Sequence, residues 1–280
     1  MLSIRSSRKP SHNAMAVVTG AGSGIGRAFA LEIARRGGAV LCSDINLETV
    51  RETVSLIERE GGQAWAFKCD VSKLTQVEAL AEEADRVLPG PVSLVINNAG
   101  VGVGGLPVGE TPIKDWKWTL GINLWGVIHG SHVFTPRLKR QGYGGIINVA
   151  STAGFSAAPL MSVYNVSKAG ALALTETLAA ELAGTGVAVT ALCPTLVKTN
   201  IGANGKIVGE SRGMFDRLMD KIGMSPDRVV RDALNGLDRG DLYILPQFDA
   251  RVIWRAKRFI PRTYAMGAGL ISRFGTSRLQ

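Results

Sequence analysis

The sequence predicts an α/β fold, with a single doubly wound parallel sheet of about seven strands and helices on both faces. Three observations support this prediction. Short apolar runs alternate with helical patterns of about 10–15 residues along most of the 280-residue chain. Several runs are apolar throughout, as is required of strands that are covered on both faces. The first run ends in a glycine-rich turn that leads directly into a helical pattern.

The expected strands and helices alternate in chain order. The runs expected as strands are residues 16–19, 39–45, 64–71, 92–96, 144–150, 187–193 and 241–245. The helical patterns cover residues 25–36, 47–60, 73–87 and 111–140, and one more helix carries Tyr164 and runs to about residue 183. Glycine pairs end the first two helices, and a Pro-Gly-Pro run at 89–91 ends the third. Right-handed crossovers then place helices on both faces of one sheet.

Composition and charge divide the chain into a body and two basic ends. Its length and its 46% hydrophobic content suit one large domain or two small ones, and no linker or repeat separates two domains. The net charge is +9, but residues 251–280 carry seven basic residues and no acidic one, and residues 1–14 carry three basic residues. We therefore expect a flexible basic tail over residues 1–14 and a main domain over residues 15–280. The nearly neutral body argues against nucleic-acid binding.

The cysteines and the hydropathy pattern indicate a cytoplasmic protein without a metal. Cys42, Cys69 and Cys193 lie in apolar, strand-like runs, so we expect buried thiols in a reducing compartment. We expect no metal, because no CxxC pair or Cys/His cluster is present. No run of about 18 apolar residues predicts a spanning helix. Residues 1–14 lack the apolar core of a signal peptide.

Residues 151–168 carry the strongest candidate for catalysis. Tyr164 and Lys168 are four positions apart, which places them on one face of a helix. A tyrosine ordinarily titrates near pH ~10 and an adjacent ammonium group favours its phenolate, so this pair could exchange a proton with an alcohol or ketone. Ser151 follows the strand at 144–150, at the end where open α/β sheets bind ligands. By itself, the spacing also fits a surface tyrosine with a lysine nearby.

The glycine-rich turn after the first strand predicts a nucleotide site. The run TGAGSGIG at residues 19–26 lies where a dinucleotide pyrophosphate binds the backbone N–H groups of a helix N-terminus, although its glycines do not follow a strict GxGxxG. Asp44 ends the second strand, where a carboxylate can accept from both ribose hydroxyls and repel a 2′-phosphate. This favours NAD over NADP, because Ser23 and Ile45 offer no cation. Asp44 could instead be a capping residue at the start of a loop.

These motifs together resemble the short-chain dehydrogenase/reductase family. The resemblance runs from about residue 15 to residue 200, and it implies a single Rossmann-type domain, a nicotinamide cofactor and hydride transfer at an alcohol or carbonyl carbon. It rests on TGAGSGIG, Cys69-Asp70-Val71, Asn97-Asn98-Ala99-Gly100, Asn123, Ser151 and Tyr164-Asn165-Val166-Ser167-Lys168.

The resemblance implies four catalytic residues. Tyr164 would be the general acid/base, and Lys168 would lower the pKa of Tyr164 and hold the nicotinamide ribose. Ser151 would hydrogen-bond the substrate oxygen. Asn123 would complete a proton relay through water, unless it is a helical residue that pairs with the backbone.

The resemblance also implies a set of cofactor-binding residues. Asp70 and Val71 would flank the adenine, and Asn97 would support the central strand and the cofactor. The whole set comprises Gly20, Ser23, Gly24, Ile25, Gly26, Asp44, Asp70, Val71, Asn97, Ala99, Gly100, Tyr164, Lys168, Pro194, Val197 and Thr199. The chain departs from the family after the sixth strand, where Thr195 follows Pro194 in place of the usual glycine. This change alters backbone freedom but removes no catalytic group.

The residues expected around the substrate are mostly apolar. They are Val101, Val103, Leu106, Ala153, Phe155, Ala157, Ala158, Leu160, Met161, Ile201, Ile207, Val208, Met214, Phe215 and Met219. Residues 196–224 mix such residues with glycines and charges, which predicts a lid, although ordinary core packing would give a similar pattern. We expect an NAD-dependent oxidoreductase that interconverts a hydrophobic secondary alcohol and its ketone or aldehyde. The alternatives are an NADP-dependent ketoreductase and a non-catalytic NAD-binding redox sensor, and the family implies a homodimer or homotetramer through the two long helices.

The basic helical extension at residues 248–280 begins with two neighbouring helical stripes. One stripe is apolar (Phe248, Val252, Ala256 and Phe259) and the other is basic (Arg251, Arg255, Arg258 and Arg262). Pro261 is expected to kink or end this helix, and a second apolar and basic stretch covers residues 264–274. The extension could pack on the body or a partner subunit, meet an acidic partner, or lie on an anionic membrane surface. Such peripheral membrane contact would suit a lipophilic substrate.

Overall fold

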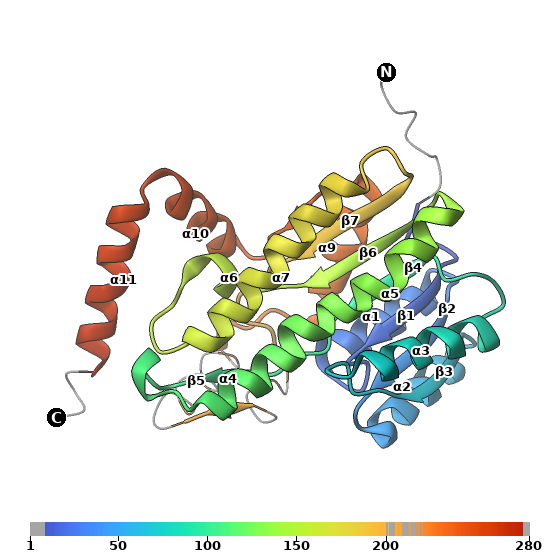
Figure 1. The fold of residues 1–280 in the computed structure, drawn as a ribbon, viewed down its shortest axis with the longest axis horizontal. Coiled ribbons are helices and arrows are strands. Elements are labelled where there is room, and N and C mark those ends of the chain that lie inside the picture. Colours follow the sequence, from blue (N-terminus) through green and yellow to red (C-terminus); the bar gives the residue numbers. More distant parts are fainter. Residues whose placement is uncertain are drawn as a thin grey trace.

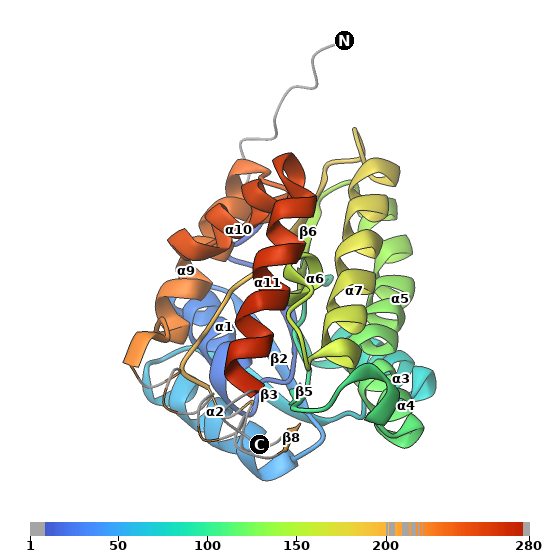
Figure 2. The same ribbon diagram turned by 90° about the vertical axis from the view of Figure 1, so that its left-hand side faces the viewer.

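The structure, a computed structural model, describes residues 9–199, 201, 205–208, 213, 217, 219 and 221–276, with side chains as far as residue 270. In this part of the chain a seven-stranded parallel sheet lies between two layers of helices (Figure 1, Figure 2). Across the sheet the strands are β3 (Gln63–Lys68), β2 (Ala39–Asp44), β1 (Met15–Thr19), β4 (Leu94–Asn97), β6 (Gly144–Val149), β7 (Val187–Leu192) and β9 (Tyr243–Ile244). The predicted doubly wound α/β fold is confirmed.

Each face of the sheet is covered by three helices. On one face lie α1 (Gly24–Arg35), α2 (Leu47–Arg59) and α9 (Pro226–Arg239), and on the other lie α3 (Leu74–Val87), α5 (Gly126–Gln141) and α7 (Ser162–Glu181). Successive residues of a strand point to opposite faces, so Ala16 and Val18 pack in the first layer and Val17 packs in the second. Because both layers are buried, the strands are apolar throughout.

The strand order reverses between β1 and β4, and this reversal positions the candidate site. The chain runs from β1 outward to β3, returns to β4 and continues outward to β9 on the other side. Ligands of such sheets bind beyond the carboxyl ends of the strands, where the order reverses. The segments that follow β1 and β4 at this edge are the glycine-rich turn at residues 20–23 and residues 98–100.

The predicted third strand is too long, because the chain turns directly after Lys68. The backbone N–H and the hydroxyl of Ser72 both donate to Asp70 Oδ1, at 3.0 and 2.7 Å. Such a local side-chain turn competes with extended backbone and leads into α3. Asp70 and Val71 therefore lie in a loop and not at the end of the strand.

The predicted long helix at 111–140 is a helical stretch with an irregular turn inside it. It begins at α4 (Ile113–Leu120), after Pro112, and continues through a π-helical turn, η2 (Gly121–Trp125), into α5. A π-helical turn inserts an extra residue into a helix and is frequent at functional sites. Asn123, one of the predicted catalytic residues, lies in this turn.

Several observed elements are not among the predicted ones. α9 has clear local signals, since Ser225 and Pro226 start it and Gly240, at a φ of 75°, ends it. The short elements α6 (Ala153–Ser156), η1 (Val108–Glu110), β5 (Val103–Gly104) and β8 (Lys206–Ile207) have too few residues to show a period in the sequence. β5 and β8 pair in parallel, outside the main sheet.

The expected flexible tail over residues 1–14 is wrong for residues 9–14. Ser11 is fully buried, and its backbone N–H and its hydroxyl donate to the carboxylate of Asp238 in α9, at 3.0 and 2.7 Å. Arg36 donates to the Ser11 hydroxyl at 2.8 Å. The predicted tail is polar and short, so its sequence did not indicate these partners at the far end of the chain. Residues 1–8 lie outside the described residues.

The C-terminal extension is helical, as predicted. α10 (Phe248–Phe259) ends just before Pro261, and α11 (Pro261–Thr276) starts at that proline. Proline has no N–H to continue a helix but is well suited to a first helical position, so one residue both ends α10 and begins α11. Residues 277–280 lie outside the described residues.

Candidate active site

Ser151, Tyr164, Lys168 and Asn123 meet beyond the carboxyl ends of β4 and β6. Ser151 is buried two residues after the end of β6, with its Oγ accepting from the Ala153 N–H at 3.1 Å. It lies within hydrogen-bonding reach of the half-buried Tyr164, in the first turn of α7. The spacing argument is confirmed, since Lys168 lies one turn further along the same helix.

The prediction that Lys168 lowers the pKa of Tyr164 stays a prediction for the enzyme with its cofactor, because Lys168 is not among the groups that shift this pKa in the protein alone. Burial raises the pKa of Tyr164 from its ordinary value, and the hydrogen bond with Ser151 only partly opposes this increase. The Lys168 Nζ atom lies 5.8 Å from the centre of the Tyr164 ring and donates to the Val149 carbonyl at 2.7 Å. The ammonium group is thus hydrogen-bonded at the end of β6 and also lies over the Tyr164 ring.

The pKa of Lys168 is itself strongly lowered. It is only 3% exposed, and burial lowers its pKa from 10.5 to about 8. The fold therefore keeps a cation inside the protein against a desolvation cost, with the Val149 carbonyl as its hydrogen-bond partner. A buried cation beside a tyrosine is an arrangement that suits proton transfer.

Asn123 is held by the backbone that follows β4. Its Nδ2 donates to the Val101 carbonyl at 2.9 Å, and its Oδ1 accepts from the Val101 N–H at 2.8 Å. The same Nδ2 lies 3.2 Å from Ser167 Oγ, on α7. Because the amide pairs with backbone outside its own helix, it joins α4 and α5 to the residues around Gly100. A Cβ atom at Gly100 would meet both Asn123 Oδ1, at 3.2 Å, and Lys168 Nζ, at 3.5 Å.

The loop between Ser151 and Tyr164 contains strained backbone. Ala157 and Leu160 have φ values of 52° and 61°, in the left-handed region that residues with a Cβ seldom adopt. The side chain of Asn165 holds this loop on α7 by donating to the Ala158 carbonyl at 2.7 Å. Strain of this kind is frequent at functional sites and needs surrounding structure to maintain it.

The glycine-rich turn is packed tightly against the end of β4. A Cβ atom at Gly26 would lie 2.0 Å from the Gly20 carbonyl, and one at Gly20 would lie 2.8 Å from Asn98 Nδ2. Asn98 Nδ2 donates to the Thr19 carbonyl at 2.8 Å, and Thr19 Oγ1 accepts from the N–H groups of Asn98 and Ala99, at 3.0 and 3.1 Å. Thr19 and Asn98 therefore position the turn, although neither was predicted as a site residue.

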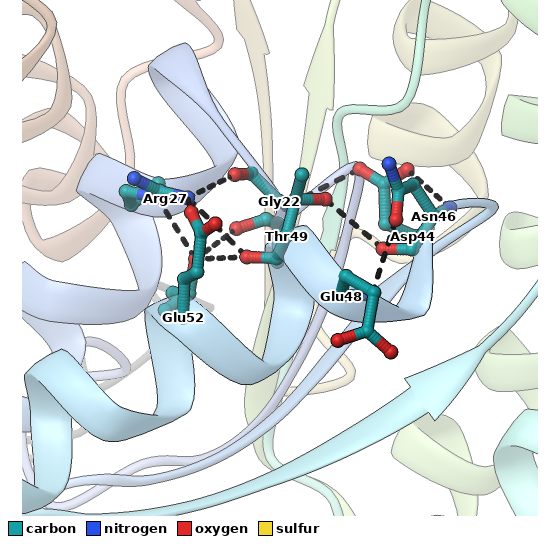
Figure 3. A network of polar contacts seen from close by, with 9 residues as sticks. Gly22, Arg27, Asp44, Asn46, Glu48, Thr49 and Glu52 are labelled. Atoms are coloured by element: carbon teal, nitrogen blue, oxygen red, sulfur yellow. Dashed lines mark hydrogen bonds and ion pairs between the residues drawn. The ribbon is translucent and has the colours of Figure 1, made fainter.

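Asp44 is bonded to the glycine-rich turn, as Figure 3 shows. Its Oδ2 accepts from the Gly22 N–H and its Oδ1 accepts from the Asn46 N–H, both at 3.1 Å. The bond to the Asn46 N–H, two residues on, also fits the alternative of a capping residue at the start of a loop. The cap of α2 itself is Asn46, whose side chain accepts from the Glu48 N–H. Asp44 thus lies where the end of β2 meets the turn.

A basic residue that sequence reasoning missed, Arg27, lies under the same turn (Figure 3). Its guanidinium donates to the Gly22 carbonyl and to Thr53 Oγ1, and it forms an ion pair with Glu52 at 2.9 Å. The charge of Arg27 is therefore already paired with a carboxylate of α2. Its position one turn into α1 could not be connected with Gly22 from spacing alone.

The remaining cofactor-site predictions divide into residues that reach this region and residues that do not. Thr199 reaches it, since a Cβ atom at Gly24 would lie 3.0 Å from Thr199 Cγ2. Asn97 does not, because its buried amide donates to Asn148 Oδ1 at 2.8 Å, inside the sheet. This hydrogen bond fits the predicted support of the central strand by Asn97. Asn98, which points to the opposite face, is the residue that contacts the turn.

Val71 is also turned away from the glycine-rich turn. Its side chain is 6% exposed and packs against Gly126 of α5, where a Cβ atom would come within 2.7 Å of it. Asp70 lies closer, because the neighbouring Cys69 N–H donates to the Asp44 carbonyl at 2.9 Å. The backbone directly before Asp70 therefore meets the end of β2, while the Asp70 carboxylate accepts from Ser72.

The predicted apolar wall of the substrate site is only partly assembled. Four of its predicted residues line one small cavity: Val103, Leu106, Leu160 and Val208. Phe155 instead packs edge-on against Trp254 of α10, with 4.9 Å between the ring centres, so it belongs to the contact with the C-terminal extension. Met214 and Phe215 lie outside the described residues, as does part of the expected lid.

The arrangement fits a nicotinamide dinucleotide. The first turn of α1 has no acidic residue and no side-chain cap at Ser23, so its backbone N–H groups are suited to a pyrophosphate. Asp44 lies beside this turn as a ribose acceptor, and Lys168 and Tyr164 lie at the opposite end of the region. Within the described residues, no group of three His, Cys, Asp or Glu side chains could hold a metal ion.

Sequence comparison places these observations among known proteins. Residues 14–206 match the short chain dehydrogenase family. EphD of Mycobacterium tuberculosis (strain ATCC 25618 / H37Rv) is 38% identical over 222 residues, which cover 76% of this chain and 37% of EphD. The chain thus spans little more than a third of the length of this relative. Cyclohexanol dehydrogenase of Acinetobacter sp. (strain SE19) is 35% identical over 188 residues, which cover 67% of this chain and 74% of that protein.

Solved structures of short-chain dehydrogenases are also similar to this chain. A short chain dehydrogenase/reductase from Burkholderia phymatum in complex with NAD superposes with a TM-score of 0.84 and 32% identity, over 89% of this chain and 94% of that one. A short-chain dehydrogenase from Sphingobium yanoikuyae in complex with NADPH gives a TM-score of 0.75 and 26% identity, over 92% of this chain and 94% of that one.

Proposed function

The chain belongs to the short-chain dehydrogenase family, and from this premise we propose that it is an NAD-dependent oxidoreductase that interconverts a hydrophobic secondary alcohol and its ketone or aldehyde. The observation that carries the proposal is the meeting of Ser151, Tyr164, Lys168 and Asn123 at the same edge of the sheet as the glycine-rich turn. A protein that only binds NAD as a redox sensor needs no buried lysine and no proton donor, so the alternative of a non-catalytic binder is less well supported.

The proposed chemistry assigns one role to each of these side chains. In alcohol oxidation, Ser151 donates a hydrogen bond to the substrate oxygen while the Tyr164 phenolate takes the hydroxyl proton. Lys168 stabilises the negative charge of that phenolate electrostatically, and Asn123 orients the backbone around Gly100 and joins a proton relay. When bound, the nicotinamide ring supplies or accepts the hydride. In ketone reduction the same proton returns from Tyr164 to the substrate oxygen.

The cofactor proposed is NAD, held by the glycine-rich turn and by Asp44. A 2′-phosphate would bring about two negative charges close to the Asp44 carboxylate, and Arg27, a basic residue that contacts the turn, is paired with Glu52. The related structures contain NAD in one case and NADPH in another. They are compatible with either cofactor, and Asp44 is our reason for preferring NAD.

Replacement of Asp44 by asparagine should move the preference towards NADP. This substitution keeps an acceptor for the Gly22 N–H and removes the charge. Two unit charges 4 Å apart in water interact by about 1 kcal/mol, so the two charges of a 2′-phosphate would be repelled by about 2 kcal/mol. We therefore expect the ratio of kcat/KM for NADP to that for NAD to rise at least about tenfold, since tenfold corresponds to about 1.4 kcal/mol. A matched E48Q variant of α2 controls for lost surface charge, and an unchanged ratio in D44N would refute the discrimination by Asp44.

The proposed substrate is lipophilic, because the described residues beside Ser151 include no arginine or histidine cluster that could clamp a carboxylate or phosphate. Cyclohexanol dehydrogenase, a relative by sequence, supports a secondary alcohol. The test is NADH formation from a panel of steroids, retinoids, long-chain alcohols and small alcohols. We expect turnover with lipophilic secondary alcohols, and turnover confined to charged or sugar alcohols would refute the substrate class. We also propose that residues 196–224 form a lid over this site.

We also propose a homodimer through the outer face of α5 and α7, from which a homotetramer could be built. Trp125, the last residue of η2, and Val166, on α7, are 52% and 48% exposed. Because η2 and α7 are in contact, the two side chains offer apolar surface to a second copy. W125E should shift the protein to a monomer in analytical ultracentrifugation, whereas W125F should not. A wild-type protein that is monomeric at micromolar concentration would contradict the proposal.

The proposed location is cytoplasmic, with a possible reversible contact with a membrane surface through the basic C-terminal helices. Among the helices of the described part of the chain, none combines the length and the apolar character needed to cross a membrane. A membrane contact would therefore have to be made by a surface of the folded domain.

A further inference from the structure

The two C-terminal helices, α10 and α11, form one exposed unit that we call the C-terminal pair. In Figure 1 they make the left-hand edge of the molecule, away from β1, β2 and β3. Figure 2 shows α11 in front of the sheet, next to α6 and with α10 behind its upper end. α6 follows Ser151, so the C-terminal pair lies beside the candidate active site.

Aromatic contacts attach the pair to α6 and to the end of the sheet. The Trp254 ring lies between Phe155 and Tyr243, with ring centres at 4.9 and 4.7 Å. The hydroxyl of Tyr264, on α11, donates to the Ser156 carbonyl at 2.9 Å. Both helices thus have one side directed at the loop that carries the predicted substrate wall.

Polar contacts attach the start of α10 to the segment after β7. Gln247, which is buried, accepts from the Thr195 N–H at 3.2 Å and donates to the Leu196 carbonyl at 3.0 Å. Thr195 Oγ1 donates to Asp249 Oδ1 at 3.2 Å. Thr195 stands where the family usually has glycine, so this departure supplies a side chain that anchors the C-terminal pair. The pair therefore contacts both segments that border the site.

The opposite side of the pair exposes large apolar side chains. Phe248 is 77% exposed and Phe259 is 81% exposed, so the apolar stripe predicted in α10 does not pack on the described body. The packing side of α10 consists instead of Ala250 and Trp254. The other large apolar residues exposed on the pair are Val252, Ile260, Met266 and Leu270. Several such residues on one surface element mark an interaction site.

Basic residues border this apolar surface. Arg251, Arg255 and Arg262 are exposed, and Arg258 lies over the Trp254 ring at 4.3 Å. Residues 248–276 hold six basic residues and one acidic residue, Asp249, which is bonded to Thr195. The nearly neutral body offers no comparable charge. The pair therefore presents an amphipathic, strongly cationic surface.

We propose that the C-terminal pair docks on the surface of an anionic lipid bilayer. Phe248 and Phe259 would enter the boundary between headgroups and acyl chains, and Arg255 and Arg262 would meet the anionic headgroups. Because the pair contacts α6 and the segment after β7, docking would place the entrance of the proposed substrate site at the membrane. This last consequence rests on the proposed function, whereas docking itself does not.

A second copy of this chain is the rival occupant, and charge disfavours it. A two-fold symmetric interface brings the same surface of both copies together. The arginines of one pair would then face the arginines of the other, and such like-charge contacts oppose association. An anionic bilayer offers both the apolar layer and the complementary charge.

The direct test is cosedimentation of the full-length protein with vesicles of phosphatidylcholine alone or with ~30% phosphatidylglycerol. We expect binding to the anionic vesicles at low salt, and much weaker binding at high salt or without the anionic lipid. R255Q/R262Q should weaken binding roughly 30-fold, at about fivefold for each basic residue. R59Q/K68Q removes the same charge from exposed positions on α2 and β3, and should change binding less than about threefold.

Phe259 provides a second variant that should not disturb the fold, because its side chain is so exposed. F259S should weaken vesicle binding about tenfold through lost apolar burial while leaving the thermal transition unchanged. Failure of the wild-type protein to bind anionic vesicles at low salt would overturn the proposal. A self-association that F259S abolishes, without any vesicle binding, would assign the surface to a second copy.

The link to the substrate is measured separately. R255Q/R262Q should reduce kcat/KM for a long-chain secondary alcohol presented in anionic vesicles about tenfold or more, and leave kcat/KM for cyclohexanol in solution unchanged. Vesicle binding with no turnover of any alcohol would refute the proposed function but not the docking. Turnover in solution without vesicle binding would refute the docking alone.

Discussion

Replacement of Tyr164 by phenylalanine will lower kcat by roughly 10²–10⁴-fold, the usual contribution of a positioned general acid or base. The ring is retained, so packing against Ser151 and α7 changes little, and the NAD dissociation constant should stay within about threefold of wild type. Tyr143→Phe is the matched control, because this residue precedes β6 at the opposite edge of the sheet. Turnover by Y164F close to that of the wild-type enzyme would remove Tyr164 from the mechanism.

The pH dependence of Tyr164 provides a second readout of the same role. Burial raises the pKa of Tyr164 above its ordinary value in the protein alone. Alcohol oxidation requires the phenolate, so kcat/KM for oxidation should still be rising at pH ~9, because this parameter reports the ionisation of the free enzyme. Ketone reduction requires the phenol and should not rise in that range. Y164F should lose the increase, and a rise that persists in Y164F would have to come from another group.

Replacement of Lys168 by methionine will lower kcat by roughly 10²–10³-fold, the effect of deleting one electrostatic contribution to a transition state. The same substitution should stabilise the fold at neutral pH. Burial lowers the pKa of Lys168 from 10.5 to about 8, and a lowering of this size costs the folded protein about 3 kcal/mol. K168M also loses the hydrogen bond to the Val149 carbonyl, which costs about 1 kcal/mol and offsets part of the gain. We therefore expect a net gain of about 2 kcal/mol in the free energy of unfolding.

Because burial lowers the pKa of Lys168, the stability gain of K168M depends on pH in a defined range. Between pH ~8 and ~10.5 the unfolded chain binds a proton at Lys168 that the folded protein has released, so the stability of the wild-type protein rises across this interval. The advantage of K168M should be complete below pH ~8 and absent above pH ~10.5. Denaturant unfolding at pH 7, 9 and 11 measures it, with K139M on the exposed end of α5 as a control. An advantage that did not change with pH would show that packing, and not charge, is its cause.

The candidate site shows which residue positions can be predicted from local sequence patterns and which cannot. Tyr164 and Lys168 were placed correctly, because their relation depends only on the period of one helix. Asn97 joins β4 to β6 through Asn148, as its predicted support of the central strand requires, but the sequence does not say which of two adjacent residues at the end of β4 faces the turn. Asn98 is the one that does, and its bonds to Thr19 join two strands that are far apart in sequence. Phe155 likewise follows Ser151 as expected, but its neighbour Trp254 is about a hundred residues away.

The sequence by itself determined the α/β class, the order of the main-sheet strands and the long helices up to α7, and the helical relation of Tyr164 to Lys168. These depend on apolar period, on glycine and proline signals, and on short motifs, all of which act within a few residues along the chain. Only the tertiary structure decided the direction of the Lys168 ammonium group, the paired state of Arg27, the burial of Ser11 and the side of α10 that stays exposed. Each depends on a partner distant in sequence, because desolvation and side-chain pairing act through space and leave no period along the chain.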